Sequence, residues 1–127
     1  MNLLLDTHVF LWWDQRNRLL NPAARGVIED PGNNVFVSAA SVWEIAIKRR
    51  RGKLKFPGSA AAAIAANGFN ELPILPRECE DAGDLAWLHT DPFDRLLVAQ
   101  AVAQALVFVT GDELIRDFEA VAKLWAR

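Results

Sequence analysis

The stretch "NNVFVSAASVWEIAIKRRRG", residues 33–52, changes its hydrophobic pattern at its middle. Residues 33–38 are a short apolar run bounded by turn residues, which is typical of a buried strand. From residue 38 onward the apolar side chains recur at helical spacing, at positions 42, 45 and 46 and at 43 and 47, and Gly52 stands where a helix would end. A buried strand that leads directly into a helix is the repeating unit of α/β proteins.

The same alternation runs along the rest of the chain. Further strands are expected at residues 2–6, 70–75 and 106–110, with a possible edge strand at 120–125. Further helices are expected at residues 21–30, 57–68, 76–88, 91–105 and 111–118. The strand segments are continuously apolar, which favours a parallel sheet covered on both faces. The sequence therefore predicts a single domain over residues 1–127, an α/β/α sandwich of three layers around a mainly parallel central sheet.

The bulk composition is that of a globular protein. The chain has 127 residues, of which 52% are hydrophobic and 24% are charged, so it is long enough to bury a core. The apolar run "NLLLDTHVFLWW" is interrupted by Asp6 and His8, is too short to cross a bilayer and lacks the features of a signal peptide. The lone Cys79 excludes a disulfide framework and a zinc site built from several cysteines. These features predict a cytoplasmic protein without a membrane association.

The charge is unevenly distributed. The stretch "KRRRGKLK", residues 48–55, holds 6 of the 14 basic side chains, and we call it the basic island. The remaining residues carry 8 basic and 16 acidic side chains. A basic island on an acidic body indicates a surface that binds a polyanion. Alternatively, its first four residues close a helix, since cations stabilise the carboxyl end of a helix.

Four carboxylates follow or flank the expected strands. Asp6 ends the first strand, and Asp112 comes two residues after the run "VFVT". Glu44 lies about two turns into the helix that leaves the second strand, and Asp94 lies in the first turn of its helix. In open parallel sheets, ligands bind outside the carboxyl ends of the strands. The four side chains could therefore meet at one edge of the sheet.

Most of these carboxylates also have a purely structural interpretation. Asp6 and Asp112 could each cap the helix that follows them. In the segment "DPFD", Asp91 as N-cap and Pro92 at the first helical position would start a helix, with Asp94 at its third position. Taken singly, each carboxylate is better explained by a structural role than by ligand binding.

Glu44 has the spacing of a capping box with Ser41 and of a helical ion pair with Lys48. Glu44 and Asp6 nevertheless lie between apolar neighbours, and a buried carboxylate needs a partner or takes up a proton. A divalent cation would supply this partner to all four carboxylates. Mg²⁺ and Mn²⁺ prefer such oxygen ligands, activate water and stabilise charge on a phosphoryl oxygen.

Other kinds of active site are disfavoured. The sequence has no GxxxxGK[ST] loop for a nucleotide phosphate and no evident Ser-His or Cys-His arrangement, and neither His8 nor His89 has metal-ligand spacing to a second histidine. A phosphoacceptor receiver domain would need paired acids after its first strand and a lysine after its last. The segments "LLLDTH" and "VFVTGDE" provide neither.

Four segments, in this order and at this spacing, resemble the PIN domains of VapC-type toxins: "LLLDTHVFLWW", "SAASVWEIAIKRRRGKL", "HTDPFDRLLVAQA" and "VFVTGDELI". The resemblance extends from residue 3 to the strand near residue 124. It implies a Mg²⁺- or Mn²⁺-dependent endoribonuclease of a type II toxin–antitoxin system. It also implies an RNA substrate, a homodimer and inhibition by a VapB-type antitoxin.

The resemblance also assigns roles to residues. The catalytic and metal-binding residues, which we call the acidic quartet, would be Asp6, Glu44, Asp94 and Asp112. Supporting positions would be Thr110, Thr7 and Asp91, the last as a helix cap beside Asp94. Two positions depart from the family's pattern and would affect how RNA is held: Thr90, where a basic residue is common, and Gly111, where other members carry a side chain.

Contacts to RNA phosphates are expected from the basic island, through Lys48, Arg49, Arg50, Arg51, Lys53 and Lys55. Most of the five tryptophans are expected in the core, although one near the surface could stack on an unpaired base. The alternative is a PIN-like domain that binds RNA or protein without cutting. A missing quartet acid would have favoured this alternative, and all four are present.

Overall fold

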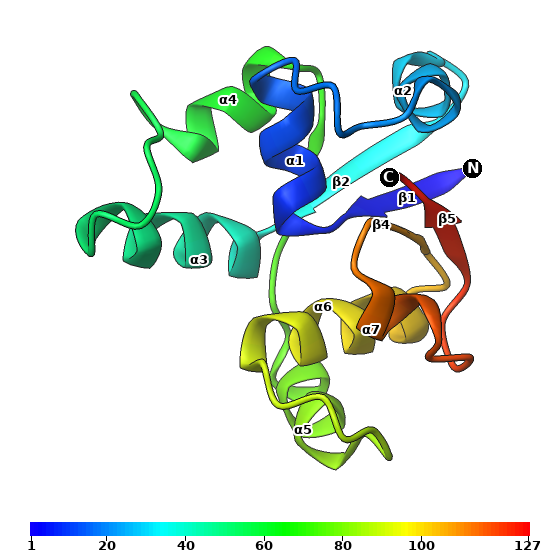
Figure 1. Cartoon of the computed structure of the whole chain (residues 1–127). Coiled ribbons are helices and arrows are strands. Elements are labelled where there is room, and N and C mark those ends of the chain that lie inside the picture. The colour runs from blue at the N-terminus through cyan, green and yellow to red at the C-terminus, as the bar shows by residue number, and fades with distance from the viewer.

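Five strands form one parallel sheet at the centre of this computed structural model, which describes residues 1–127 (Figure 1). The strands are β1 (Asn2–Leu5), β2 (Asn34–Ser38), β3 (Asn70–Leu72), β4 (Val107–Thr110) and β5 (Lys123–Trp125). Their order across the sheet is β3-β2-β1-β4-β5, and every neighbouring pair is parallel. In the central strand, Leu4 pairs with Phe36 of β2 and Phe108 of β4. The predicted parallel sheet is therefore confirmed.

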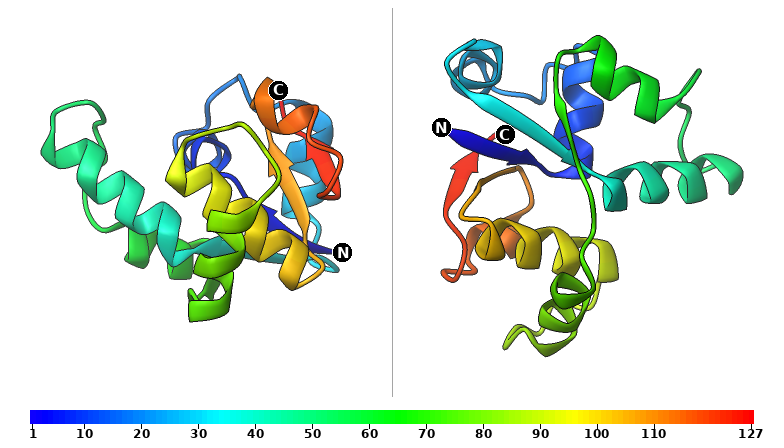
Figure 2. Two further views of the ribbon diagram at one scale, coloured as in Figure 1. Left: turned by 90° about the horizontal axis from the view of Figure 1, so that it is seen from below. Right: turned by 180° about the vertical axis from the view of Figure 1, so that it is seen from behind.

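Seven helices surround the sheet, and all but one of them form the two layers that cover its faces. The seven helices are α1 (Thr7–Asp14), α2 (Pro22–Glu29), α3 (Ala39–Arg50), α4 (Ala60–Ala66), α5 (Pro76–Asp84), α6 (Pro92–Ala103) and α7 (Glu113–Arg116). Figure 2 shows α1, α2 and α4 on one side of the sheet and α5, α6 and α7 on the other, while α3 projects beyond the strand ends. None of the helices is both long and apolar enough to cross a membrane.

The sheet separates two hydrophobic cores. Leu3 and Leu5 of β1 point into the core under α1, α2 and α4, whereas Leu4 points into the core under α6 and α7. All three leucines are fully buried, because successive side chains of a strand face opposite sides of the sheet. This is the three-layer α/β/α sandwich that the apolar strands predict.

The helix expected at residues 76–88 ends at Asp84, and the prediction of its last turn is wrong. The guanidinium of Arg95 on α6 takes the place of further helical hydrogen bonds. It donates at 2.7–3.3 Å to five backbone carbonyls, those of Ala82, Gly83, Leu85, Trp87 and His89. Because one side chain satisfies these carbonyls, the segment after α5 turns back toward α6.

Two other expectations need correction. The strand expected at 70–75 is only three residues long, and Pro73 directly after it has no backbone N–H to continue the ladder. The tryptophans are not core residues: four are partly buried, and Trp43 is 61% exposed. Trp12, Trp13 and Trp87 pack against the cores as partly buried side chains.

A buried polar network fixes α5 and α6 against the sheet. Glu78 of α5 accepts hydrogen bonds from the backbone of Leu75 and from the amides of Gln100 and Gln104 on α6. Although burial opposes ionisation, these three donors hold the pKa of Glu78 below its usual value. The amide oxygen of Gln100 accepts from Ser38 at the end of β2. The network therefore sets the position of α6, which carries Asp94, relative to the strand ends.

Candidate metal centre

The acidic quartet lines one cavity of about 390 Å³ at the carboxyl ends of the strands. Asp6 directly follows β1, and Asp112 comes two residues after β4. Glu44 is the sixth residue of α3, which continues β2, and Asp94 is the third residue of α6. Four elements far apart in the sequence thus bring the four predicted carboxylates together.

The helix-capping interpretation also holds for part of this set. Asp6 is the N-cap of α1, Asp91 that of α6 and Asp112 that of α7, and each carboxylate accepts a backbone N–H of its helix. Asp91 accepts from both Phe93 and Asp94, so it fixes the first turn that carries Asp94. Capping and convergence on the cavity are compatible, because each carboxylate oxygen has two lone pairs and a single hydrogen bond leaves one of them available.

Asp6 is held by two threonines that the sequence analysis names as supporting residues. It is 1% exposed, and its oxygens accept from the Thr7 backbone at 2.8 Å and from the Thr110 hydroxyl at 2.7 Å. The Thr7 hydroxyl instead donates to Ser41 of α3 at 2.9 Å. Thr110 lies behind the cavity, fully buried, and also accepts from the backbone of Asp112. Thr110 therefore connects two acids of the quartet.

Glu44 has one satisfied and one unsatisfied oxygen. Its Oε2 accepts from Lys48 at 2.6 Å, which confirms the helical ion pair. Burial alone would lower the pKa of Lys48, but the hydrogen bond and charge of Glu44 outweigh it and raise the pKa. The capping box with Ser41 is wrong, because α3 begins earlier, with Ser38 as its N-cap. The other oxygen, Oε1, is buried without any hydrogen-bond partner.

Two histidines adjoin the quartet, and neither was predicted from the sequence to belong to the site. His89 Nε2 lies 2.6 Å from Asp94 Oδ2. His8 Nε2 accepts the backbone N–H of Gly111, so the neutral ring carries its proton on Nδ1, 3.4 Å from Asp6. Burial lowers the pKa of His8 despite the surrounding carboxylates. The spacing between histidines gives no sign of either residue, because each histidine lies beside a carboxylate and not beside a second histidine. The available signal was closeness in sequence: His8 comes two residues after Asp6, and His89 comes five residues before Asp94.

The electrostatics of the cavity favour a cation. Burial, with the charges of Glu44 and Asp112 in addition, raises the pKa of Asp6 from 3.8 to about 7. Burial and the charge of Asp6 do the same to Asp94, whose pKa is also about 7. Both carboxylates thus resist ionisation unless a positive charge arrives.

The donor set also fits a divalent ion. Glu44 lines the cavity, and its buried Oε1 has no hydrogen-bond partner, so it lacks the partner that a cation would supply. Ligand atoms of His89, Asp94 and Asp112 all lie within 4.8 Å of one another. Carboxylate oxygens suit Mg²⁺ and Mn²⁺, and an imidazole suits the transition metal better.

Known proteins resemble this chain over almost its whole length. The PIN domain family matches residues 3–124. This chain belongs to the PIN-domain family. A relative, ribonuclease VapC22 of Mycobacterium tuberculosis, is 31% identical over 118 residues, which are 91% of this chain and 90% of the relative. A shorter match of 40 residues, 45% identical, covers 32% of this chain and 28% of ribonuclease VapC16 of the same organism.

Solved structures share the fold of this PIN domain. VapBC2 from Rickettsia felis, bound to a DNA fragment from its promoter, superposes with a TM-score of 0.72 at 13% identity and covers 98% of both chains. A toxin–antitoxin complex from Klebsiella pneumoniae gives a TM-score of 0.66 at 16% identity, over 97% of this chain and 96% of the other. At these identities the likeness concerns the fold.

Only part of the basic island reaches the cavity of this PIN domain. Lys48 and Lys53 line the cavity, whereas the guanidinium of Arg49 donates to the carbonyls of Phe56 and Gly58 and so fixes the loop after α3. Arg50, Arg51 and Lys55 are exposed. Lys48, Arg49 and Arg50 lie in the last turn of α3, as the helix-end interpretation predicts, and Arg50, Arg51 and Lys55 also form an exposed positive surface.

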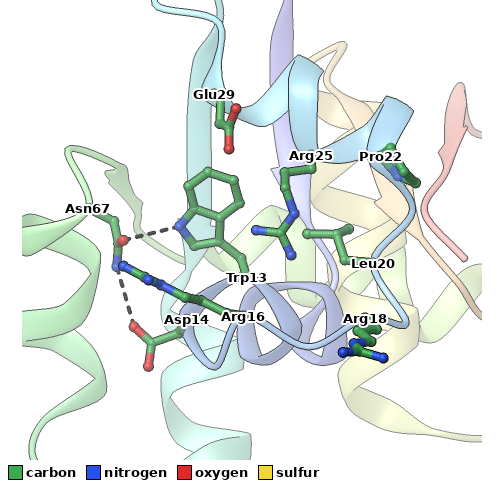
Figure 3. A pocket seen from close by; sticks show the side chains of 9 residues that line it. All are labelled: Trp13, Asp14, Arg16, Arg18, Leu20, Pro22, Arg25, Glu29 and Asn67. Atoms are coloured by element: carbon green, nitrogen blue, oxygen red, sulfur yellow. Dashed lines mark hydrogen bonds between the residues drawn. The ribbon is translucent and has the colours of Figure 1, made fainter.

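The largest cavity, about 760 Å³, is a separate site. It lies at the other end of α1 and is lined by Arg16, Arg18 and Arg25, together with Asp14 and Glu29 (Figure 3). Arg25 lies over the ring of Trp13, 5.6 Å from its centroid. Its charges are mixed and its two carboxylates are not clustered, so it does not resemble the acidic centre.

The raised pKa values predict how stability depends on pH when divalent ions are removed. A folded-state pKa of about 7 for Asp6, against 3.8 unfolded, means that the folded protein binds this proton more tightly. The proton on Asp6 contributes fully to the free energy of unfolding below pH 3.8, and this contribution is lost as the pH rises through 7. In EDTA, Asp6→Asn should therefore become more stable relative to the wild type by about 2–3 kcal/mol between pH 5 and pH 8.

Urea unfolding of both proteins at the two pH values measures this difference. The comparison cancels groups whose pKa does not depend on Asp6, such as Glu78, because both proteins contain them. A difference that does not change with pH would contradict a proton held on Asp6.

Proposed function

We propose that this PIN domain, a single domain over residues 1–127, is a metal-dependent endoribonuclease that hydrolyses RNA phosphodiester bonds. The observation that carries the proposal is the convergence of Asp6, Glu44, Asp94 and Asp112 on one cavity, with Glu44 Oε1 left without a partner. The similarity to a ribonuclease over nine-tenths of both chains supports it. The same similarity disfavours the non-catalytic alternative.

The acidic quartet would hold Mg²⁺ or Mn²⁺, which supplies activation of water and neutralisation of charge at the phosphate. The remaining side chains of the centre hold these ligands in place. Thr110 fixes the carboxylate of Asp6, Lys48 that of Glu44 and His89 that of Asp94. Supporting contacts of this kind orient the ligands and set their basicity.

Substrate would be held mainly through its backbone. Lys53 lines the cavity, and the exposed Arg50, Arg51 and Lys55 continue the positive surface at the end of α3. Such contacts release counterions, so RNA binding should weaken strongly with salt and depend little on sequence. Specific recognition would then involve unpaired bases near the cut bond.

The biological context that fits this activity is a type II toxin–antitoxin pair. The structures that share this fold include VapBC2 and a toxin–antitoxin complex, and on this basis a VapB-type antitoxin is the proposed partner. A homodimer and a cytoplasmic location, where its RNA substrate is found, complete the proposal.

The testing experiment is an RNA cleavage assay on the purified chain, with a structured RNA pool, in Mg²⁺, in Mn²⁺ and in EDTA. Cleavage that requires a divalent ion and stops in EDTA would support the proposal. Addition of the purified VapB-type protein to the assay should suppress the cleavage. RNA that is bound but intact under every condition would establish the non-catalytic alternative instead.

A further inference from the structure

A second cavity adjoins the metal centre, and we call it the side cavity. Its volume is about 500 Å³, and it shares His8 and Asp112 with the cavity of the acidic quartet. The other lining residues are Trp12 of α1, Gly111 after β4, Glu113 and Leu114 of α7, and Arg127. Any molecule that places a phosphate at the quartet therefore has open space beside it for one neighbouring group.

The wall of the side cavity suits a flat, uncharged group. Leu114 is 60% exposed, and Trp12 is partly exposed and packs edge-on against His8, with ring centroids 4.7 Å apart. Charged side chains also line the cavity: the carboxylates of Asp112 and Glu113 outnumber the single guanidinium of Arg127, so a second phosphate is disfavoured. A nucleobase has the required shape and no charge, and bases stack well on aromatic and apolar side chains.

The absence of a side chain at Gly111 allows Trp12 to take its place in this wall. A Cβ atom at this position would lie 2.9 Å and 3.0 Å from the Cη2 and Cζ3 atoms of Trp12, closer than a side chain tolerates. The backbone N–H of Gly111 also donates to His8 at 3.0 Å. The absent side chain thus allows the indole to lie against the backbone that leads from β4 to Asp112.

We propose that the side cavity binds one nucleobase of the RNA, that of the nucleotide next to the phosphate held at the acidic quartet. This inference rests on the proposed ribonuclease function and adds to it a binding site for a base. The base contacts Trp12 and Leu114, whereas the phosphate remains at Asp6, Glu44, Asp94 and Asp112. Because the contact is apolar, its effect should depend on the presence of a base more than on its identity.

The test combines a change in the protein with a change in the RNA. A short RNA that contains one mapped cut site is prepared with a single abasic ribose at each nucleotide near the cut. For the wild type, one of these abasic positions should reduce kcat/KM by about tenfold, as expected for a lost stacking contact. In Leu114→Ala the same abasic position should cost less than about threefold, because the two changes remove the same contact.

Two further variants make the result specific. Trp12→Phe keeps an aromatic ring but shortens it, and it should reduce the same abasic penalty. Leu19→Ala removes a comparably exposed leucine, 47% exposed in the loop between α1 and α2, and should keep the full penalty.

Equal penalties in the wild type and both side-cavity variants would overturn the inference, as would a wild type that is insensitive to every abasic position. Absence of metal-dependent cleavage of the unmodified RNA would instead overturn the proposed function, and the inference with it. The two failures are distinguishable because the second is seen before any abasic RNA is used.

Discussion

Asp94→Asn should abolish metal-dependent RNA cleavage, with a loss of more than about 100-fold, since removal of a residue that merely supports a metal ligand already costs about 10- to 100-fold. Asparagine has the size of aspartate and can still accept a hydrogen bond from His89. The start of α6 is retained because its N-cap, Asp91, is unchanged. The substitution removes only the negative charge that would bind a cation. The measurement is the rate of cleavage in Mn²⁺, with the bound metal counted by isothermal titration calorimetry.

The stability of the variant separates this result from unfolding. Because burial and the charge of Asp6 raise the pKa of Asp94, the substitution removes an unfavourable charge and should increase thermal stability in EDTA at neutral pH. Lower activity together with higher stability is expected when a residue is needed for function but its charge destabilises the folded protein. Full activity in the variant would show that Asp94 does not hold the metal.

Asp91→Asn is the matched control, three residues earlier in the same segment. Asparagine is as good an N-cap as aspartate, so the hydrogen bonds to Phe93 and Asp94 should persist. This variant should keep cleavage within about tenfold of the wild type, the lower limit for loss of a supporting contact. A loss as large as that of Asp94→Asn would mean that both aspartates of "DPFD" bind the cation.

The second large effect is expected from Arg95→Lys. Lysine keeps the charge but has a single nitrogen, which cannot replace a planar fork that reaches five carbonyls. Loss of these contacts should lower the free energy of unfolding by about 3 kcal/mol, as measured by urea denaturation. It should also reduce cleavage, because the same segment positions His89 beside Asp94.

Hydrogen exchange locates the effect of Arg95→Lys. Amides of residues 85–91 should exchange faster, while those of the central strand β1 should change only with the global stability. The control is Arg18→Lys, because the exposed Arg18 makes no hydrogen bond or ion pair in the structure. Its stability should equal that of the wild type. A stable Arg95→Lys protein would show that water can satisfy the five carbonyls.

The strands and the acidic quartet were accessible from the sequence because both depend on local order along the chain. A continuously apolar run marks a buried parallel strand, and an acid directly after such a run must lie at the strand's carboxyl end. Asp6 and Asp112 follow this rule in the structure. Predicting that Glu44 and Asp94 join them required that their helices begin at the same edge of the sheet, as helices that follow parallel strands do.

Features that depend on contacts across the fold were not accessible. Arg95 is one of 14 basic residues in the sequence, and only its approach to the end of α5 gives it five partners. The length of α5 was overestimated for the same reason, since the apolar pattern of 85–88 continues although the helix ends. Trp43 sits in a helical apolar pattern but faces solvent, because α3 projects beyond the sheet that would have covered it.

The bond between Thr110 and Asp6 joins residues 104 positions apart, and it has a consequence for synthesis of the protein. On the ribosome, Asp6 emerges early, but β4 and Asp112 follow only after most of the chain has been made. Contacts of such sequence separation also form slowly. A growing chain therefore carries an incomplete set of the four carboxylates beside the ribosomal RNA and its own messenger, and the set is complete only after β4 and Asp112 have emerged.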